Sequence, residues 1–370
     1  WCVEEGAEHT FTFAEMEAMS NRAANLFQSY GIGRGDKVML VLKRHYQFWF
    51  AILALHKLGA VAVPGTHLLT EKDLKYRYEM AEVKAIVCTS DGDVREHADA
   101  AQKACPFMKV KMSAGGYGRP MEGWIDFDRA LEDQPDTFER RETSTRDVML
   151  LYFTSGTTGQ PKMVVHNYQY PIAHIVTAKY WHCVDPDGLH LTLAETGWAK
   201  AVWGKLYGQW FMGAGIFVYD FEKFVPSDLL ELITKYRITT FCAPPTVFRF
   251  FIKEDLSKYD LSCLQHTTIA GEALNPEVFQ QFYKATGLRL MEAFGQTETT
   301  VQCATLKGMT PRPGSMGKPN PVYHLDLVDE DLNPVRPGEV GEIIIRPKEN
   351  QVGIFDGYYR DPDLTAQVWR

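Results

Sequence analysis

The sequence lacks paired cysteines. Its seven cysteines are scattered along 370 residues, and no two of them form a C-x-x-C pair. An odd, dispersed set argues against a disulfide framework and against a zinc site built on cysteine pairs. We therefore expect reduced thiols and a cytoplasmic protein.

An excess of positive charge is also missing. The 39 basic residues are outnumbered by 47 acidic ones, which gives a formal net charge of −8 at pH 7. The sequence contains no basic tract. Because nucleic acids attract proteins through positive charge, we expect no nucleic-acid partner.

Long hydrophobic runs and a signal peptide are absent as well. The longest apolar stretch, residues 48–64, contains His56 and Lys57, so we expect no membrane span. The sequence starts with Trp1 rather than Met and stops at Arg370. We expect both ends to be cut from a longer protein.

What the sequence does contain is a regular alternation of predicted strands and helices. A capping box at Thr12 and Glu15 starts the first helix, which ends near Gly31. Predicted strands cover residues 37–42, 60–63, 84–88, 148–152, 189–193, 215–219, 239–242, 266–269 and 289–292. Predicted helices cover residues 45–58, 70–80, 93–104, 225–236 and 276–286. This alternation favours an α/β fold with mainly parallel sheets between helices.

The alternation changes twice along the chain. Residues 113–147 are rich in glycine and charge and predict no regular structure, and strands 323–329 and 342–346 follow one another without a helix. We therefore expect two packed α/β subdomains, residues 1–147 and 148–312. Residues 313–370 should form a small β-barrel subdomain.

One loop, directly after the strand at 148–152, has the composition of a phosphate-binding turn. Its two glycines permit positive φ and close backbone approach, and successive N–H groups in such a turn favour an anion. The spacing differs from the common nucleotide loop, which has four residues between its glycines. The alternative is a flexible linker. The members of this loop are Thr154, Ser155, Gly156, Thr157, Thr158, Gly159, Gln160, Pro161 and Lys162.

Two further loops follow predicted strands whose carboxyl ends should share one edge of a sheet. They are residues 270–273 and 293–299. In the second, Phe294 could stack on a nucleobase, Thr297 could donate to a phosphate, and Glu298 could hold Mg²⁺. The alternatives are core packing for Phe294 and an ordinary solvated carboxylate for Glu298. With the phosphate loop, the pattern predicts an enzyme that uses ATP and Mg²⁺.

Four motifs, in this order, resemble the acyl-adenylate-forming superfamily of acyl-CoA synthetases, peptide-synthetase adenylation domains and luciferases. They are Tyr152 to Lys162, Gly271-Glu272, Glu292 to Thr299 and Gly353 to Tyr359. Thr196-Gly197-Trp198 and Lys162 to His166 are similar to the acetyl-CoA-synthetase-like and medium-chain branch. The resemblance implies that ATP and a carboxylic acid form acyl-AMP, and that CoA then takes the acyl group.

The resemblance also implies roles for individual residues. Residues 154–162 should hold the β- and γ-phosphates, and Gly271, Glu272 and Ala273 should line the adenine pocket with Phe294 against the ring. The third motif adds to the ATP site Glu292, Ala293, Phe294, Gly295, Gln296 and Thr297. The catalytic set implied is Thr154, Lys162, Thr297 and Glu298, with Thr297 at the α-phosphate and Glu298 binding Mg²⁺.

The acyl pocket and the CoA site follow from the same resemblance. Acetyl-specific relatives carry Trp where this chain has Gly295, so longer acids should enter, while Lys200 and Trp203 should narrow the pocket. We expect a short-to-medium-chain acid, branched forms included, and a wider range of acids for Lys200→Ala. Core packing is the alternative for Trp203. The pocket residues implied are Trp198, Ala199, Lys200, Trp203, Ala270 and Gly295. CoA should contact Arg95 and His67, and the alternative for Arg95 is a solvated helix arginine.

Family members continue past residue 370 with a ribose-binding Asp, a hinge and a mobile C-terminal domain that carries the catalytic Lys. We therefore expect this chain to be the large N-terminal domain, with weak ATP binding and poor turnover by itself. Two alternatives remain open. One is an adenylation domain that loads an acyl or aminoacyl group onto a carrier protein, for which Glu195 is the nearby candidate to bind an amine. The other is a nucleotide-binding module without catalysis.

Overall fold

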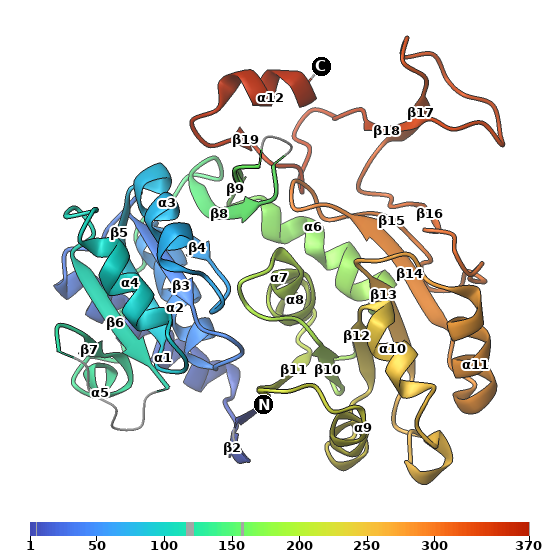
Figure 1. The fold of residues 1–370 in the computed structure, drawn as a ribbon, viewed down its shortest axis with the longest axis horizontal. Coiled ribbons are helices and arrows are strands. Elements are labelled where there is room, and N and C mark those ends of the chain that lie inside the picture. Colours follow the sequence, from blue (N-terminus) through green and yellow to red (C-terminus); the bar gives the residue numbers. More distant parts are fainter. Residues whose placement is uncertain (5, 116–121, 157–158, 370) are drawn as a thin grey trace.

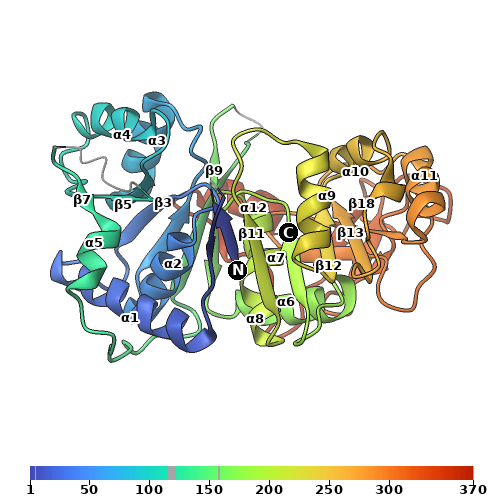
Figure 2. The same ribbon diagram turned by 90° about the horizontal axis from the view of Figure 1, so that it is seen from below.

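The computed structural model describes residues 1–4, 6–115, 122–156 and 159–369. In this part of the chain, two large sheets carry most of the strands, and helices pack against both (Figure 1). The blue-to-teal elements form one unit and the yellow-to-orange elements form the other. Figure 2 shows the two units side by side, with the N-terminus between them. The predicted α/β fold is confirmed.

The first sheet has eight strands in the described ranges, in the order β19-β9-β8-β4-β3-β5-β6-β7. They are β3 (Lys37–Val41), β4 (Val61–Pro64), β5 (Val83–Thr89), β6 (Val110–Ala114), β7 (Ile125–Asp126), β8 (Val148–Thr154), β9 (Lys162–Asn167) and β19 (Gly357–Tyr358). The pairs from β8 to β7 are parallel, whereas β8–β9 and β9–β19 are antiparallel. β7 lies in the segment for which the sequence predicts no regular structure.

Helices cover both faces of this sheet because its strands are apolar on both sides. In β3, Val38 and Leu40 belong to a core shared with α1 and α2, whereas Met39 and Val41 belong to a core shared with α3 and α4. Successive side chains of a strand point to opposite faces, so an unbroken apolar run needs apolar partners on both. The helices are α1 (Phe13–Ser29), α2 (Gln47–Leu58), α3 (Glu71–Ala81), α4 (Val94–Gln102) and α5 (Phe127–Glu132). The predicted capping box at Thr12 is present.

The second sheet has nine strands in the described part of the chain, in the order β16-β15-β14-β13-β12-β10-β11-β1-β2. They are β1 (Cys2–Glu4), β2 (Ala7–His9), β10 (Leu189–Thr192), β11 (Gly215–Tyr219), β12 (Thr240–Ala243), β13 (His266–Ala270), β14 (Leu290–Gly295), β15 (Val301–Ala304) and β16 (Lys318–Pro319). Its centre is parallel, and β2, β15 and β16 join antiparallel at the two edges.

The helices of the second unit fall into two groups. Helices α9, α10 and α11 pack on one face through a core that includes Phe217 and Phe241. Helices α6, α7 and α8 pack into the core that also contains α1 and α2, so one core joins both units. The elements are α6 (Tyr170–Val176), a π-helical turn (Thr177–Trp181), α7 (Ala199–Lys205), α8 (Tyr207–Phe211), α9 (Pro226–Lys235), α10 (Pro245–Phe251), a 3₁₀ turn (Leu256–Lys258) and α11 (Pro276–Thr286). None of the helices in the described ranges has the length and hydrophobicity needed to cross a membrane.

The C-terminal part does not form the predicted small barrel in the residues described. Strands β17 (Leu325–Val328) and β18 (Glu342–Ile345) make a two-stranded antiparallel sheet, and α12 (Pro362–Val368) follows later. A closed barrel needs further strands, but β16 and β19 pair with the two large sheets instead.

The division of the strands between the two large sheets does not follow the order of the chain on either side of residue 147. Strands β8 and β9 belong to the first sheet, and the N-terminal strands β1 and β2 belong to the second. The subdomain boundaries at residues 147 and 312 stay predictions. The loop after β8 of the first sheet lies next to the ends of β13 and β14 of the second sheet, where the candidate site lies.

Candidate active site

A cavity of about 1400 Å³ lies where strands of both sheets end. Thr154 ends β8 of the first sheet, and Ala270 and Gly295 end β13 and β14 of the second. Ligands of open α/β sheets bind at such carboxyl ends. The predicted site residues that line the cavity are Thr154, Ser155, Lys162, Trp198, Ala199, Lys200, Trp203, Ala270, Gly271, Glu272, Ala273, Glu292, Ala293, Phe294, Gly295, Gln296, Thr297 and Glu298.

The loop between β8 and β9 is a tight turn. The Gly159 N–H donates to the Gly156 carbonyl oxygen at 3.3 Å. A Cβ on Gly156 would come within 2.3 Å of the Gln160 carbonyl oxygen, and Gly159 has a φ of +83°, so both positions require glycine. The Pro161 carbonyl accepts a hydrogen bond from Tyr76 of α3 at 2.9 Å. Two predicted members of this loop lie outside the described residues: Thr157 and Thr158.

Lys162 and Glu298 meet at the wall of the cavity. Lys162 begins β9, and Glu298 lies between β14 and β15. The Lys162 Nζ is 2.7 Å from Oε1 of Glu298. The hydroxyl of Tyr358 in β19 accepts from Lys162 Nζ at 2.7 Å and donates to the same Glu298 oxygen at 2.8 Å. The three groups form a closed triangle.

The hydrogen bonds of this triangle favour a protonated Lys162, an ionised Glu298 and a neutral Tyr358. Burial opposes the charge of Lys162, but hydrogen bonds to Glu298 and Tyr358 outweigh it and raise the pKa of Lys162. Burial also opposes the charge of Glu298, yet the bonds from Lys162 and Tyr358 lower the pKa of that carboxyl. Burial, followed by the Tyr358 bond to Glu298, raises the pKa of the Tyr358 hydroxyl. The pair is therefore ionised at neutral pH, and the hydroxyl keeps its proton.

The donor chemistry around Glu298 fits Mg²⁺. This ion prefers oxygen ligands and takes one or two protein carboxylates together with phosphate and water. The bonds from Lys162 and Tyr358 both go to Oε1 of Glu298, which leaves Oε2 outside the triangle. The Glu298 side chain is 13% exposed and lines the cavity together with Thr154.

The loop that carries Thr297 is fixed from β9. His166 donates from Nε2 to the Thr297 carbonyl oxygen at 2.7 Å, and its ring stacks on Tyr170 with the centroids 3.7 Å apart. Burial lowers the pKa of His166 to about 4. A neutral imidazole therefore holds the segment on which the α-phosphate contact is predicted.

Two glutamates of the predicted ATP site are bonded to protein donors. The Glu272 carboxylate accepts from Thr246 Oγ1 at 3.0 Å and from Arg249 Nη2 at 3.2 Å. Glu292 is buried and accepts from the Gly314 N–H at 2.8 Å. Burial raises the pKa of Glu292. These carboxylates hold the loops in place at one side of the cavity.

Trp203 fills the space that Gly295 leaves open. A Cβ on Gly295 would come within 2.7 Å of Trp203 Cη2, and the Trp203 indole donates to the Tyr170 hydroxyl at 3.0 Å. Lys200 Nζ donates to the Ala270 carbonyl oxygen at 2.8 Å. The side chains predicted to narrow the pocket are thus both held by hydrogen bonds.

Glu195 is not free to bind a substrate amine. It accepts from Thr66 Oγ1 and from the backbone N–H and Nδ1 of His67, each at 3.0 Å. Burial opposes its charge, but the bonds from His67 outweigh it and lower the pKa of Glu195. His67 does not itself line the cavity, although Glu195 does. Its contact with CoA stays a prediction.

Arg95 lies away from the cavity. It is buried in α4, and its Nη1 donates to Ser113 Oγ of β6 at 3.5 Å. The alternative of a solvated helix arginine is therefore wrong, because only 8% of the residue is exposed. Its contact with CoA stays a prediction.

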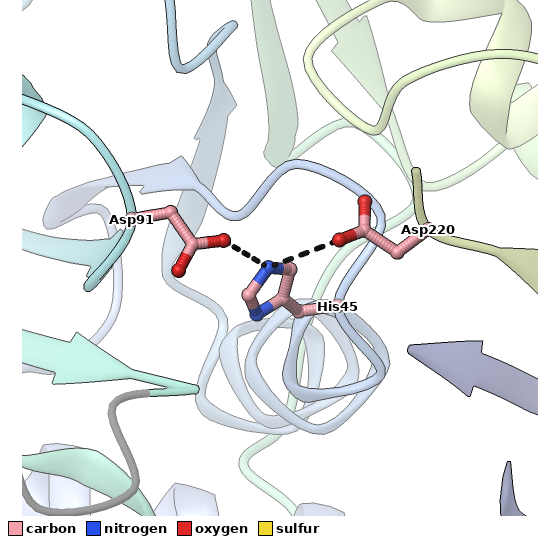
Figure 3. Close-up of side chains that lie close together, drawn as sticks. All are labelled: His45, Asp91 and Asp220. Carbon is pink, nitrogen blue, oxygen red and sulfur yellow. Dashed lines mark ion pairs between the residues drawn. The ribbon is translucent and has the colours of Figure 1, made fainter. Parts of the chain in front are cut away.

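A second charged group, which the sequence does not predict, joins the first sheet to the loop between β10 and α7. This loop, residues 193–198, lines the cavity and is called the cavity loop below. Lys43 and His45 follow β3. Figure 3 shows the His45 ring between Asp91 and Asp220, with Nε2 3.3 Å and 3.7 Å from their carboxylates. This His-Asp-Asp set has metal-ligand chemistry, but Lys43 Nζ lies 2.9 Å from the same Asp91 oxygen and 3.5 Å from Asp220. The ammonium thus supplies the positive charge, while the Thr196 N–H donates to the Lys43 carbonyl at 2.9 Å.

Lys205, at the end of α7, is a buried lysine close to this group. Its Nζ donates to the Ala194 carbonyl oxygen, next to Glu195. Burial, helped by the charge of Arg44, lowers the pKa of Lys205 to about 7. The side chain therefore holds the cavity loop whether it carries its charge or not.

Replacing Lys205 by Met should flatten the pH dependence of stability between about pH 7 and pH 10. An unfolded lysine holds its proton up to about pH 10.4, whereas Lys205 releases it near 7. The unfolded chain thus binds more protons in this window, so wild-type stability should gain from Lys205 as the pH rises. Urea unfolding midpoints across the window measure the slope. Lys284→Met, exposed on α11, should keep the wild-type slope, and an equal slope for Lys205→Met would contradict the prediction.

Part of the cavity wall escapes the sequence patterns. Arg44 and Phe221 follow β3 and β11, and the guanidinium of Arg44 lies 4.1 Å over the Phe221 ring. The rule that ligands gather at carboxyl ends of strands could have flagged both. Tyr358, which contacts Lys162 and Glu298 but is not itself among the lining residues, lies in a recognised motif and has no predicted role. The other lining residues are Leu193, Ala194, Glu195, Phe224, Pro244, Thr246, Val247, Phe250, Ile269, Gly314 and Met316.

The chain is similar to known proteins along nearly all of its length. The family described as AMP-binding enzyme matches residues 1–359. The chain belongs to the AMP-binding enzyme family. Human mitochondrial acyl-coenzyme A synthetase ACSM5 is 37% identical to it over 369 residues, which cover 99% of this chain and 63% of the human protein. The chain thus spans less than two thirds of that relative's length.

Two further proteins are similar to the chain. Mouse mitochondrial acyl-coenzyme A synthetase ACSM3 is 34% identical, over all of this chain and 64% of the mouse protein. Among solved structures, the anthranilate CoA ligase AuaEII in complex with anthranoyl-AMP aligns with a TM-score of 0.90 at 25% identity. That alignment covers 97% of this chain and 68% of the ligase.

The comparison corrects the predicted cytoplasmic location. The human and mouse relatives of the chain are both mitochondrial acyl-coenzyme A synthetases. Scattered, unpaired cysteines argue only against an oxidising compartment. They cannot distinguish one reducing compartment from another, which is why the prediction is wrong.

Proposed function

We propose that the protein is an AMP-forming acid–thiol ligase, an acyl-CoA synthetase for short-to-medium-chain carboxylic acids. In this reaction, the carboxylate attacks the α-phosphate of ATP and pyrophosphate leaves. The thiol of CoA then attacks the acyl-AMP, and AMP leaves. The observation that carries the proposal is that one cavity is lined by members of the phosphate-type loop (residues 154–162), by Glu298 and by Trp203. In it, Lys162 Nζ and Glu298 Oε1 lie 2.7 Å apart.

The residues of this chain would bind and orient the reactants rather than react covalently. Lys162 and the N–H groups of its loop would hold the β- and γ-phosphates, and Thr297 would contact the α-phosphate. Glu298 would hold Mg²⁺, which when bound supplies positive charge to the phosphate oxygens. Adenine would lie between residues 271–273 and Phe294. These roles agree with the cavity position of every residue named.

The acid class follows from the volume left beside Trp203. Its indole occupies the space next to Gly295 and is held by Tyr170, and Lys200 is held across the cavity by Ala270. A long straight chain would have to displace one of these fixed side chains. A short-to-medium-chain acid, straight or branched, needs no such displacement.

Measuring pyrophosphate release by the full-length protein tests the proposal. A panel of acids from two to twelve carbons, straight and branched, is assayed with and without CoA. We expect acid-dependent pyrophosphate release, and acyl-CoA and AMP as products when CoA is present. Failure of every acid to release pyrophosphate would overturn the proposed function. Pyrophosphate release without any transfer to CoA would place the acceptor in another class.

Replacing Trp203 by Ala should shift the preference toward longer acids. Removing the indole opens the space beside Gly295, so the ratio of kcat/KM for a longer acid to that for the preferred acid should rise roughly tenfold to a hundredfold. Gly295→Ala is the opposing change, because its methyl group would come within 2.5 Å of the Thr300 carbonyl oxygen and 2.7 Å of Trp203 Cη2. It should narrow the pocket and favour shorter acids, and its thermal unfolding midpoint shows whether the backbone tolerates the methyl group. An unchanged acid profile in both variants would contradict a pocket wall at Trp203.

A further inference from the structure

The segment of residues 353–359 fastens together the two halves of the candidate phosphate site. The Phe355 N–H donates to the Glu298 carbonyl oxygen at 2.8 Å. Strand β19, which contains Tyr358, pairs with β9, the strand that begins at Lys162. The loop of Glu298 and the strand of Lys162 are therefore both bonded to this one segment.

Tyr358 is held rigidly within the segment. Only 6% of the residue is exposed. Its backbone N–H donates to Thr365 Oγ1 at 2.9 Å, and its ring packs edge-on against Phe355 with the centroids 4.9 Å apart. The preceding Gly357 has a φ of +126°, and a Cβ there would come within 2.8 Å of Thr365. The position of the Tyr358 hydroxyl is thus fixed by its surroundings.

The hydroxyl can serve both charged partners at the same time. A phenol accepts and donates simultaneously, and here it accepts from Lys162 and donates to Glu298 Oε1. Lys162, by contrast, sits on a flexible four-carbon stem. If the ammonium turns away from the carboxylate, the fixed hydroxyl still holds Oε1 and leaves Oε2 directed elsewhere.

We propose that Tyr358 is a positioning residue of the magnesium and triphosphate site. Its hydroxyl holds the carboxylate of Glu298 through one oxygen, so that the other is available to a cation. The inference rests on the proposed function, because it needs ATP and Mg²⁺ as ligands of this cavity.

Replacing Tyr358 by Phe tests the inference, because the change removes the hydroxyl and keeps the ring. In the variant, Lys162 and Glu298 have lost their shared neighbour and should hold each other more strongly. The magnesium concentration needed for half-maximal ATP binding should therefore rise roughly tenfold, the typical effect of one hydrogen bond to a charged group. Binding of ATP in excess chelator should stay within about twofold of wild type. Calorimetric titration of the full-length protein with ATP at graded MgCl₂ measures both.

Tyr359→Phe is the matched control. Tyr359 belongs to the same segment, but its ring lies against Lys37 and Arg360, each 5.4 Å from its centroid. This variant should keep the wild-type magnesium requirement. The thermal unfolding midpoint of each variant, recorded alongside, separates loss of fold from loss of positioning.

The possible outcomes separate the two proposals. If wild-type protein binds no ATP at any magnesium concentration, the proposed function and this inference both fail. If wild type binds ATP with magnesium and Tyr358→Phe has the same magnesium requirement, only the inference is overturned. Equal weakening of ATP binding with and without magnesium would assign Tyr358 a purely structural role and would also overturn it.

Discussion

Glu298→Gln should reduce acid-dependent pyrophosphate release by roughly a hundredfold or more, the usual effect of removing one group that stabilises transition-state charge. The amide keeps the shape of the side chain but removes the negative charge that Mg²⁺ requires. It also leaves Lys162, 2.7 Å away, without its counter-charge. Single-turnover assays of pyrophosphate release at saturating ATP and acid measure the effect.

An exposed glutamate provides the control for this experiment. Glu231→Gln, on the exposed side of α9, changes the net charge by the same amount and should leave the rate within about twofold, as surface substitutions usually do. Raising MgCl₂ should restore part of the activity of Glu298→Gln if the loss lies in metal binding. A folded Glu298→Gln protein with wild-type rate and magnesium requirement would refute the metal role.

Lys43→Met should destabilise the fold by about 3–5 kcal/mol, the range found when one partner of a buried ion pair is removed. The Lys43 side chain is 2% exposed, and its Nζ lies 2.6 Å from Glu222 in addition to its contacts with Asp91 and Asp220. Met fills a similar volume but removes the ammonium, so that Asp91 keeps its ion pair with His45, and Asp220 keeps those with His45 and Arg44. Urea unfolding monitored by tryptophan fluorescence measures the loss.

Two controls distinguish the buried charge from simple repacking. Lys284→Met on the surface of α11 should change stability by no more than about 0.5 kcal/mol. Adding Asp220→Asn to Lys43→Met should recover part of the loss, because it removes one carboxylate left without its cation. Independent, additive effects of the two changes would show that the pair does not interact.

The pH dependence of Lys43→Met gives a further check on the same group. Burial opposes protonation of His45, but its bond to Asp91 and the charges of Glu4, Asp220 and Asp91 outweigh it and raise the His45 pKa. A raised pKa means that protonated His45 stabilises the fold at low pH and that this contribution is lost as the pH rises through the raised value. In Lys43→Met, His45 becomes the main buried cation of the group, so the destabilisation should grow as the pH rises above about 6.5, where an unfolded histidine loses its proton.

Local patterns were sufficient to find β8, β13 and β14 and the loops at their ends, but not β9, the strand that begins at Lys162. The Gly156 and Gly159 turn follows an apolar strand directly, so composition and spacing within a dozen residues indicate an anion-binding loop. The segment 293–299 begins within β14 and continues past its end at Gly295. Once both loops lie at carboxyl ends of parallel strands, the rule for open α/β sheets brings them to one edge. This is why eighteen of the predicted residues share the cavity.

The small barrel shows where local patterns no longer predict the fold. The segments at 325–328 and 342–345 read correctly as strands, but a strand does not specify its partner. Strands β16 and β19 pair with the two large sheets, and β8 and β9 belong to the first of these sheets. Pairing is decided by which edges and apolar faces meet after collapse, and that information is spread over the whole chain.

The sequence by itself determined the α/β alternation, the glycine turn after β8 and the position of the carboxylate at 298 in the loop after β14, because each depends on neighbours in the chain. Only the tertiary structure decided that Trp203 fills the space beside Gly295, that Tyr358 bridges Lys162 and Glu298, and that Lys43 is buried among aspartates. These contacts join segments far apart in sequence. A buried charge or a filled gap is stable only when its partner arrives from elsewhere, and no local period records that partner.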